Sequence, residues 1–221
     1  MRDLCISASI LSADIGCLAK ESTAVLQAGA NSLHIDVMDN HFVPNLTFGP
    51  LVCRALRKHL PKAFLDVHLM VNPVDNLIDA FAAAGADQIS FHPEASNDVI
   101  KNLKQIRHLG CKAGLAINPA TSLNCLDNKW EYLDSILMMS VNPGFAEQHF
   151  IPEVLNKILV TKQLLTIHKP SICLGVDGGV KKNNIAEIAK AGANTFILGS
   201  GIFNTKDYYL TLAELRSELN L

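Results

Sequence analysis

The chain has 221 residues, of which 49% are hydrophobic and 18% charged, and its formal net charge is −2. This composition suits one compact domain with a large core, and we expect a single domain over residues 1–221. The near-neutral charge argues against a nucleic acid or an anionic membrane surface as the main partner.

Strand-like and helix-like segments alternate along the whole chain. The predicted strands cover residues 5–10, 33–38, 64–70, 88–92, 112–117, 135–139, 172–177 and 195–199. The predicted helices cover residues 16–28, 49–59, 73–84, 96–109, 121–128, 152–167, 182–191 and 206–219. No apolar run approaches the length of a membrane span. Six scattered cysteines without a C-x-x-C pair, and no recognisable secretory signal, lead us to expect reduced thiols and a cytoplasmic location.

A weak internal repeat indicates how these segments assemble. Glycine turns at Gly29, Gly85, Gly110 and Gly192 each follow a helix-like segment and precede a strand-like one. Glycine just past a helix commonly forms a left-handed C-terminal cap. The intervals between the turns fit multiples of about 27 residues, which predicts about eight strand–helix units. We therefore expect an α/β fold with a single (β/α)₈ TIM barrel, in preference to an open doubly wound sheet.

Polar residues on three predicted strands indicate a metal site. In the strand at 33–38, apolar residues alternate with His34 and Asp36, so the two polar side chains point to the same face. The next strand carries His68 on its polar side, and the seventh predicted strand ends at Asp177. Two imidazoles and two carboxylates suit one divalent ion, with Zn²⁺ favoured and Fe²⁺, Mn²⁺ or Co²⁺ acceptable.

A simpler interpretation treats each histidine as a hydrogen-bonded core residue. For one histidine on an apolar strand that interpretation is the better one. Four polar groups pointing into a barrel need mutual compensation, however, and a metal ion supplies it. Asp66 lies on the same strand face as His68, where it could orient a metal ligand or make a purely structural hydrogen bond.

The two aspartates also indicate a reaction. Asp36 and Asp177 come from the second and seventh predicted strands, which are three steps apart around a ring of eight, so they can face each other across a ligand. Carboxylates on opposite faces of a carbon can remove a proton from one side and return it to the other, while a metal stabilises the intervening enediolate. Met38, Met70 and Met139 lie at strand ends nearby. They are either core filler or the lining of a dry pocket.

Glycines follow the last three predicted strands. They are Gly144, Gly178 with Gly179, and Gly199 with Gly201 around Ser200. In TIM barrels these loops often bind phosphate through backbone N–H groups. The long connections at 39–47 and 141–151 are typical of active-site loops. There is no G-x-x-x-x-G-K-[ST] signature, so nucleotide hydrolysis is not indicated.

Six stretches together resemble a known family, the ribulose-phosphate 3-epimerases, over essentially the whole chain. These stretches are residues 6–14, 34–45, 66–70, 139–145, 176–179 and 199–200. The resemblance implies a (β/α)₈ barrel that interconverts D-ribulose 5-phosphate and D-xylulose 5-phosphate in the pentose phosphate pathway. It also implies a homo-oligomer, either a dimer or a hexamer.

The resemblance assigns roles to individual residues. It implies one divalent metal on His34, Asp36, His68 and Asp177, with Asp36 and Asp177 as the acid/base pair. Ser9 and His68 match substrate-contacting positions, although Ser9 on propensity alone is equally a strand-end turn residue. The phosphate-binding positions carry over to Gly144, Phe145, Ala146, Gly178, Gly179, Gly199 and Ser200.

Two departures from the family pattern affect these expectations. Ala8 stands where the family commonly has proline, a small loss of rigidity. The family's usual Gly-Phe-Gly-Gly-Gln reads Gly144-Phe145-Ala146-Glu147-Gln148 here. If either replaced glycine needs a positive φ, strain of about 1 kcal/mol or more is expected. A glutamate beside a phosphate dianion is also repulsive unless its side chain turns to solvent.

Two alternatives to a ketopentose epimerase remain open from the sequence. An epimerase of a ketohexose 6-phosphate, such as allulose 6-phosphate, would use the same centre with a roomier pocket. A phosphosugar-binding module without catalysis would need neither Asp36 nor Asp177, so the presence of both argues against it.

Overall fold

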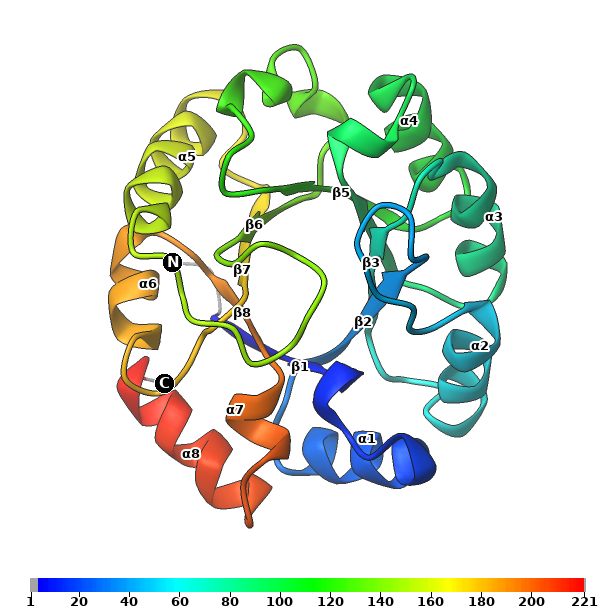
Figure 1. Ribbon diagram of the computed structural model, residues 1–221. Helices are drawn as coiled ribbons and strands as arrows, with labels where there is room; N and C mark the ends of the chain where they lie inside the picture. Colours follow the sequence, from blue (N-terminus) through cyan, green and yellow to red (C-terminus); the bar gives the residue numbers. More distant parts are fainter. Residues whose placement is uncertain (1–3, 221) are drawn as a thin grey trace.

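Eight short strands pair in parallel in chain order, and the last pairs with the first to close a barrel. The computed structural model describes residues 4–220 and is seen along the barrel in Figure 1. The strands are β1 (Cys5–Ser9), β2 (Ser32–Met38), β3 (Leu65–Met70), β4 (Gln88–Phe91), β5 (Lys112–Ile117), β6 (Ser135–Met139), β7 (Cys173–Asp177) and β8 (Thr195–Leu198). Each predicted strand is confirmed to within one residue at either end. The predicted (β/α)₈ barrel is confirmed as well.

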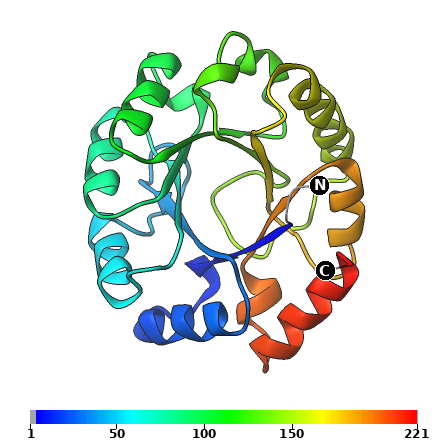
Figure 2. The same ribbon diagram turned by 180° about the vertical axis from the view of Figure 1, so that it is seen from behind.

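Helices surround the strands on the outside, as both views of the barrel show (Figure 2). The helices are α1 (Leu18–Gln27), α2 (Pro50–His59), α3 (Asp75–Ala83), α4 (Val99–His108), α5 (Val154–His168), α6 (Ile185–Ala191), α7 (Ser200–Phe203) and α8 (Tyr208–Glu218). All four predicted turn glycines have positive φ, between 85° and 119°. None of the helices within residues 4–220 is both long and apolar enough to cross a membrane.

The predicted helix at 121–128 is wrong. In its place the connection from β5 to β6 contains two 3₁₀ turns, Leu123–Leu126 and Trp130–Tyr132. Ser122 caps the first turn by accepting a backbone hydrogen bond, and Asn128, with a φ of 61°, redirects the chain after it. Side chains of this type hydrogen-bond to nearby backbone and so favour turns over a continuous helix. The sequence analysis also missed α7, a short helix directly after β8.

The two faces of each strand have different surroundings. On β2, Leu33 and Ile35 are fully buried in the main apolar core together with residues of the surrounding helices. His34 and Asp36 alternate with them and point into the barrel. TIM barrels are usually filled by bulky branched residues. In this barrel, among the described residues, the buried apolar side chains outside the main core form only two small clusters, Ala116 with Leu137, Met139 and Ile197, and Met38 with Val43 and Met70.

Strand register brings the polar interior residues together. In the β2–β3 pair, Asp36 lies opposite His68 and His34 lies opposite Asp66. Asp177 ends β7, three strands away from β2 around the ring. The barrel therefore positions these side chains through backbone hydrogen bonding before any ligand is considered.

Side chains on the outward faces of the barrel strands should contribute strongly to the free energy of unfolding. Replacing Ile35 by alanine leaves a cavity in the main core and should lower the free energy of unfolding by about 2–5 kcal/mol. Leu51, which is 77% exposed on α2, provides the control. Leu51→Ala should change stability by no more than about 0.5 kcal/mol. Urea titrations followed by circular dichroism measure both. Similar losses for the two variants would contradict this description of the core.

Candidate active site

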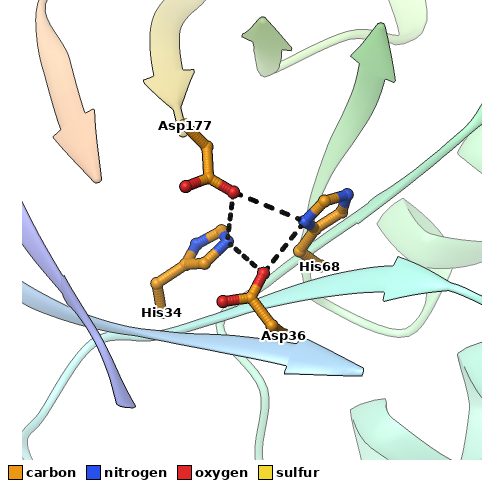
Figure 3. Close-up of side chains that lie close together, drawn as sticks. All are labelled: His34, Asp36, His68 and Asp177. Carbon is orange, nitrogen blue, oxygen red and sulfur yellow. Dashed lines mark hydrogen bonds and ion pairs between the residues drawn. The ribbon is translucent and has the colours of Figure 1, made fainter. Parts of the chain in front are cut away.

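Four ionisable side chains converge inside the barrel near the carboxyl ends of their strands (Figure 3). His34 and Asp36 come from β2, His68 from β3 and Asp177 from β7. One nitrogen or oxygen atom of each lies within 4.8 Å of the corresponding atoms of the other three. The Oδ1 atom of Asp36 lies 3.4 Å from Nε2 of His34 and 3.2 Å from Nδ1 of His68. The Oδ2 atom of Asp177 lies 3.8 Å and 3.9 Å from the same two nitrogens.

The cluster fits a divalent cation. Nε2 of His34 is buried, faces both carboxylates and makes no hydrogen bond. The other ring nitrogen, Nδ1, lies 2.8 Å from Oδ2 of Asp66 and can donate its proton there. Nε2 then faces two carboxylate oxygens, which is unfavourable unless this nitrogen carries a proton or a cation lies between them. Two imidazole nitrogens and two carboxylate oxygens are suitable ligands for such an ion.

Asp66 orients His34. Its Oδ2 accepts from His34, and its Oδ1 accepts a hydrogen bond of 2.8 Å from Nε2 of Gln88. A carboxylate behind a histidine fixes which ring nitrogen carries the proton and holds the ring in place. Of the two roles left open by the sequence, the geometry supports the orienting one.

The two aspartates have unlike acidities. Burial disfavours the charged form of Asp36, but the neighbouring His34 and His68 outweigh burial and hold the pKa of this carboxyl well below its usual range. Burial, reinforced by the negative charge of Asp36, raises the pKa of Asp177 to about 7. For His34, burial opposes protonation, yet Asp36 and Asp66 outweigh it and raise the pKa of the imidazole. Without a bound cation, one carboxyl is thus ionised at neutral pH while the other can hold a proton, so the two groups are not equivalent.

Hydroxyl groups hold both aspartates in position. Ser9 Oγ donates a 2.6 Å hydrogen bond to Oδ2 of Asp36, which leaves Oδ1 facing the imidazoles. Ser140 Oγ lies 2.9 Å from the carbonyl oxygen of Asp177 and 2.6 Å from that of Gly178. These contacts fix the carboxyl end of β7 beside the loop that follows it.

A pocket opens above the cluster at the carboxyl ends of the strands. His34 and His68 are fully buried beneath it, whereas Asp36 and Asp177 reach it. The other residues singled out from the sequence all line this pocket: Ser9, Met38, Met70, Met139, Gly144, Phe145, Ala146, Gly178, Gly179, Gly199 and Ser200. The structure therefore brings every one of the predicted site residues to one place.

The loops after β6 and β7 pack closely against each other at the pocket rim. The loop after β6 lies across the barrel opening (Figure 1). Gly179, in the loop after β7, has a φ of +66°, and a Cβ atom added to it would lie 2.4 Å from the backbone nitrogen of Phe150. A side chain at this position would therefore push the two loops apart.

Ala146 and Glu147, in the loop after β6, stand where the family usually has glycine, and they differ in backbone conformation. Glu147 adopts a φ of 63°, whereas Ala146 does not have a positive φ. A left-handed conformation at a non-glycine residue costs on the order of 1 kcal/mol. The Glu147 carboxylate accepts a 2.7 Å hydrogen bond from Nδ2 of Asn204, at the end of α7. The strain anticipated from the sequence thus applies to one of the two positions, and Asn204 holds the carboxylate.

Several contacts at the site were not anticipated. His92 lies directly after β4, with its Nε2 2.9 Å from Nε2 of His68. The alternation of Gln88, Ser90 and His92 could have placed His92 inside the barrel. Asn45 Nδ2 donates to the carbonyl oxygen of Gly144 and joins the loops after β2 and β6. No local pattern signals a contact between residues so far apart in the chain.

The chain is similar to known proteins in sequence and in structure. The ribulose-phosphate 3 epimerase family matches residues 5–203. A ribulose-phosphate 3-epimerase of Escherichia coli (strain K12) is 52% identical over 219 residues, covering 99% of this chain and 97% of the relative. A protein of the same name from Serratia marcescens is 53% identical over 208 residues, covering 94% of this chain and 99% of the relative.

Solved structures of low sequence similarity share the fold. The 3-keto-L-gulonate-6-phosphate decarboxylase from Vibrio cholerae O1 aligns with a TM-score of 0.72 at 15% identity, covering 100% of this chain and 98% of that one. The thiamine phosphate pyrophosphorylase from Pyrococcus furiosus aligns with a TM-score of 0.68 at 16% identity, covering 98% and 96%. At these identities the likeness concerns the barrel alone.

Because the two rim loops pack closely, alanine should destabilise the protein more at Gly179 than at Gly110. Gly179→Ala adds a clash with Phe150 to the strain of a positive φ, and should lower the free energy of unfolding by about 1–3 kcal/mol. Gly110 also has a positive φ, 85°, but an added Cβ meets nothing within 4 Å. Gly110→Ala should cost about 1 kcal/mol or less. Chemical denaturation compares the pair. A loss for Gly179→Ala no larger than that for Gly110→Ala would show that the loops are not in close contact.

Proposed function

Because the chain belongs to the ribulose-phosphate 3-epimerase family, we propose that it interconverts D-ribulose 5-phosphate and D-xylulose 5-phosphate by moving a proton at C3. This reaction is a step of the pentose phosphate pathway. The observation that carries the proposal is the pair Asp36 and Asp177. The two carboxyls come from strands on different sides of the barrel, differ in acidity and reach the same pocket.

In the proposed mechanism the two aspartates act on opposite faces of C3. Asp36, ionised and held by Ser9, removes the proton from one epimer. Asp177, which reaches the pocket from the other side of the barrel, delivers a proton to the other face. The roles are exchanged in the reverse direction. Because each carboxyl serves one face, a proton removed from one side is replaced from the other, and the stereocentre is inverted.

We propose that His34, Asp36, His68 and Asp177 hold one divalent cation, with Zn²⁺ favoured and Fe²⁺, Mn²⁺ or Co²⁺ as alternatives. When bound, the cation supplies positive charge beside the ketose carbonyl, which lowers the cost of the negative charge that develops when C3 loses its proton. The orphaned Nε2 of His34, aimed at both carboxylates, supports this assignment. Met38, Met70 and Met139 are assigned to the apolar wall of the pocket. The substrate contact that the resemblance implied for His68 is not carried over, because its ring is fully buried beneath the residues that line the pocket.

The phosphate group is assigned to the opposite side of the pocket. There the loops after β6, β7 and β8 contribute small residues and backbone N–H groups. The first N–H groups of α7 have no partners within the helix and are suited to bind phosphate oxygens. The proposed phosphate-binding residues are Gly144, Phe145, Ala146, Gly178, Gly179, Gly199 and Ser200.

Broader properties follow from this assignment. We propose that residues 1–221 act as a single catalytic domain, and that it works in the cytoplasm, since a charged phosphosugar does not cross a membrane unaided. We also propose a homo-oligomer, a dimer or a hexamer, as the family resemblance implies. Sedimentation velocity would measure the mass, and a monomer at micromolar concentration would contradict the oligomer.

Solvent exchange at C3 tests the proposed function. In D₂O, the metal-loaded protein should incorporate deuterium at C3 of ribulose 5-phosphate and xylulose 5-phosphate, as detected by NMR. Asp177→Asn should lower kcat by at least about 10²-fold, because one face of C3 loses its acid. Asp79→Asn, on the exposed surface of α3, is the control and should leave kcat unchanged. Metal content is measured for each variant, so that loss of the ion is separated from loss of the carboxyl.

The outcomes separate the competing functions. Binding of the ketopentose phosphate without exchange would contradict the epimerase and favour a phosphosugar-binding module. Faster exchange with allulose 6-phosphate than with ribulose 5-phosphate would favour a ketohexose phosphate epimerase. Chelation should abolish exchange, and addition of a divalent metal should restore it.

The strained loop gives a second prediction. Combining Ala146→Gly with Glu147→Gly should lower the KM for ribulose 5-phosphate, because a carboxylate lining the pocket that receives the phosphate is removed. Removing a repulsion of about 1 kcal/mol corresponds to roughly a fivefold change. Since Glu147 alone carries the charge, Glu147→Gly should give most of the effect and Ala146→Gly little. An unchanged or raised KM in the double variant would contradict this interpretation.

A further inference from the structure

His92 is a fully buried histidine next to the candidate metal centre but outside its four residues. Its ring lies 5.0 Å from that of His68, centroid to centroid, at an angle of 41°. The two Nε2 atoms are 2.9 Å apart, which is hydrogen-bond distance. One of the two nitrogens must therefore donate and the other accept.

The direction of this hydrogen bond follows from the position of His68. Nδ1 of His68 faces the centre of the cluster, 3.2 Å from Asp36 Oδ1 and 3.9 Å from Asp177 Oδ2. A nitrogen that binds a cation must present its lone pair. A neutral imidazole has one N–H group, so in a metal-binding His68 the proton is on Nε2. That N–H points at His92.

His92 must then accept through Nε2 and carry its own proton on Nδ1. We propose that His92 is a positioning residue that fixes the tautomer and ring orientation of His68, so that Nδ1 of His68 is aimed at the cation. The proposal rests on the metal site of the proposed function. His34 has the equivalent support from the Asp66 carboxylate, so each of the two imidazoles has its own partner behind it.

The surroundings of His92 favour this role over simple packing. Its Nδ1 is buried and makes no hydrogen bond with any described residue. Because one nitrogen is buried without a partner, the hydrogen bond to His68 is what sets this imidazole apart from an apolar side chain that would only fill the core. Phe42 also packs against the ring of His92, with the two ring centroids 4.8 Å apart.

A neutral acceptor also suits the charge of the site. Asp36, Asp66 and Asp177 already place three carboxyls around the position of one divalent ion. A carboxylate behind His68 would add another negative charge to a buried region, whereas an imidazole accepts the hydrogen bond without adding any. The pair of histidines therefore orients a ligand at a lower electrostatic cost than a second Asp–His pair.

The first test measures metal affinity in three variants. His92→Leu removes the acceptor and should weaken Zn²⁺ binding about 10–100-fold in competition with a chromophoric chelator. It should also change the visible spectrum of the Co²⁺-loaded protein, which reports ligand geometry. His92→Gln keeps an acceptor oxygen and should recover part of the affinity. Ser90→Ala is the matched control, because Ser90 lies opposite His68 on β4 and its buried Oγ makes no hydrogen bond. Its affinity should stay within about twofold of the unmodified protein.

The outcomes distinguish this proposal from the proposed function. If the unmodified protein binds no divalent ion at the cluster, the proposed function fails. If it binds one and folded His92→Leu binds Zn²⁺ as tightly as Ser90→Ala does, the role of His92 is overturned. A second measurement needs no variant. In the Zn²⁺-loaded, ¹⁵N-labelled protein, long-range ¹H–¹⁵N spectra should show the proton of His68 on Nε2 and that of His92 on Nδ1. A proton on Nε2 of His92 would overturn the proposal even if His92→Leu does not fold.

Discussion

The desolvation of four ionisable side chains is the constraint on which the rest of the site depends. Two carboxylates and two imidazoles lie within 4.8 Å of one another inside a barrel, and both imidazoles are inaccessible to solvent. Such groups destabilise a protein unless each is paired, hydrogen-bonded or bound to a cation. Residues that surround the cluster meet part of this requirement through hydrogen bonds. Asp66 and His92 support the imidazoles from behind, and Ser9 holds one oxygen of Asp36. Among the four side chains of the cluster, the buried atom left without a hydrogen bond is Nε2 of His34, which faces the centre where one divalent ion fits.

In this barrel the outward strand faces stabilise the fold, and the inward faces carry the candidate active site. Outward side chains such as Ile35 belong to the main apolar core, while the inward alternates carry the site. A second division, between the proposed metal ligands and the residues assigned to phosphate, appears around the rim of the barrel. β2 and β3 supply three of the four proposed metal ligands, and the loops after β6, β7 and β8 supply the small residues assigned to phosphate. A ketose phosphate lying between the two groups would have its reacting carbon beside Asp36 and Asp177 and its phosphate at the glycine loops.

Much of this arrangement could be predicted from local patterns, and the failures have physical causes. Period-two alternation placed His34 and Asp36 on the inner face of β2 because strand geometry alone determines it. The helix expected at 121–128 was wrong because side chains such as Ser122 and Asn128 stabilise turns in a segment whose apolar spacing also fits a helix. The Asn45–Gly144 and Asn204–Glu147 contacts join residues far apart in the chain, so no local pattern could reveal them. Strand alternation and strand order also predicted the metal cluster and the opposing aspartates, whereas the ketopentose substrate and the contact role of Ser9 came from the family resemblance.

The central claim is that one cation is shared by two aspartates that lie on opposite faces of the reacting carbon. Anomalous X-ray diffraction from crystals of the metal-loaded protein with bound ribulose 5-phosphate, or an unreactive analogue of it, tests this claim most directly. The account predicts a single ion bonded to His34 Nε2, His68 Nδ1 and one oxygen each of Asp36 and Asp177, with C3 of the sugar between the two carboxyls. An ion bound elsewhere, or both carboxyls on the same side of C3, would contradict it.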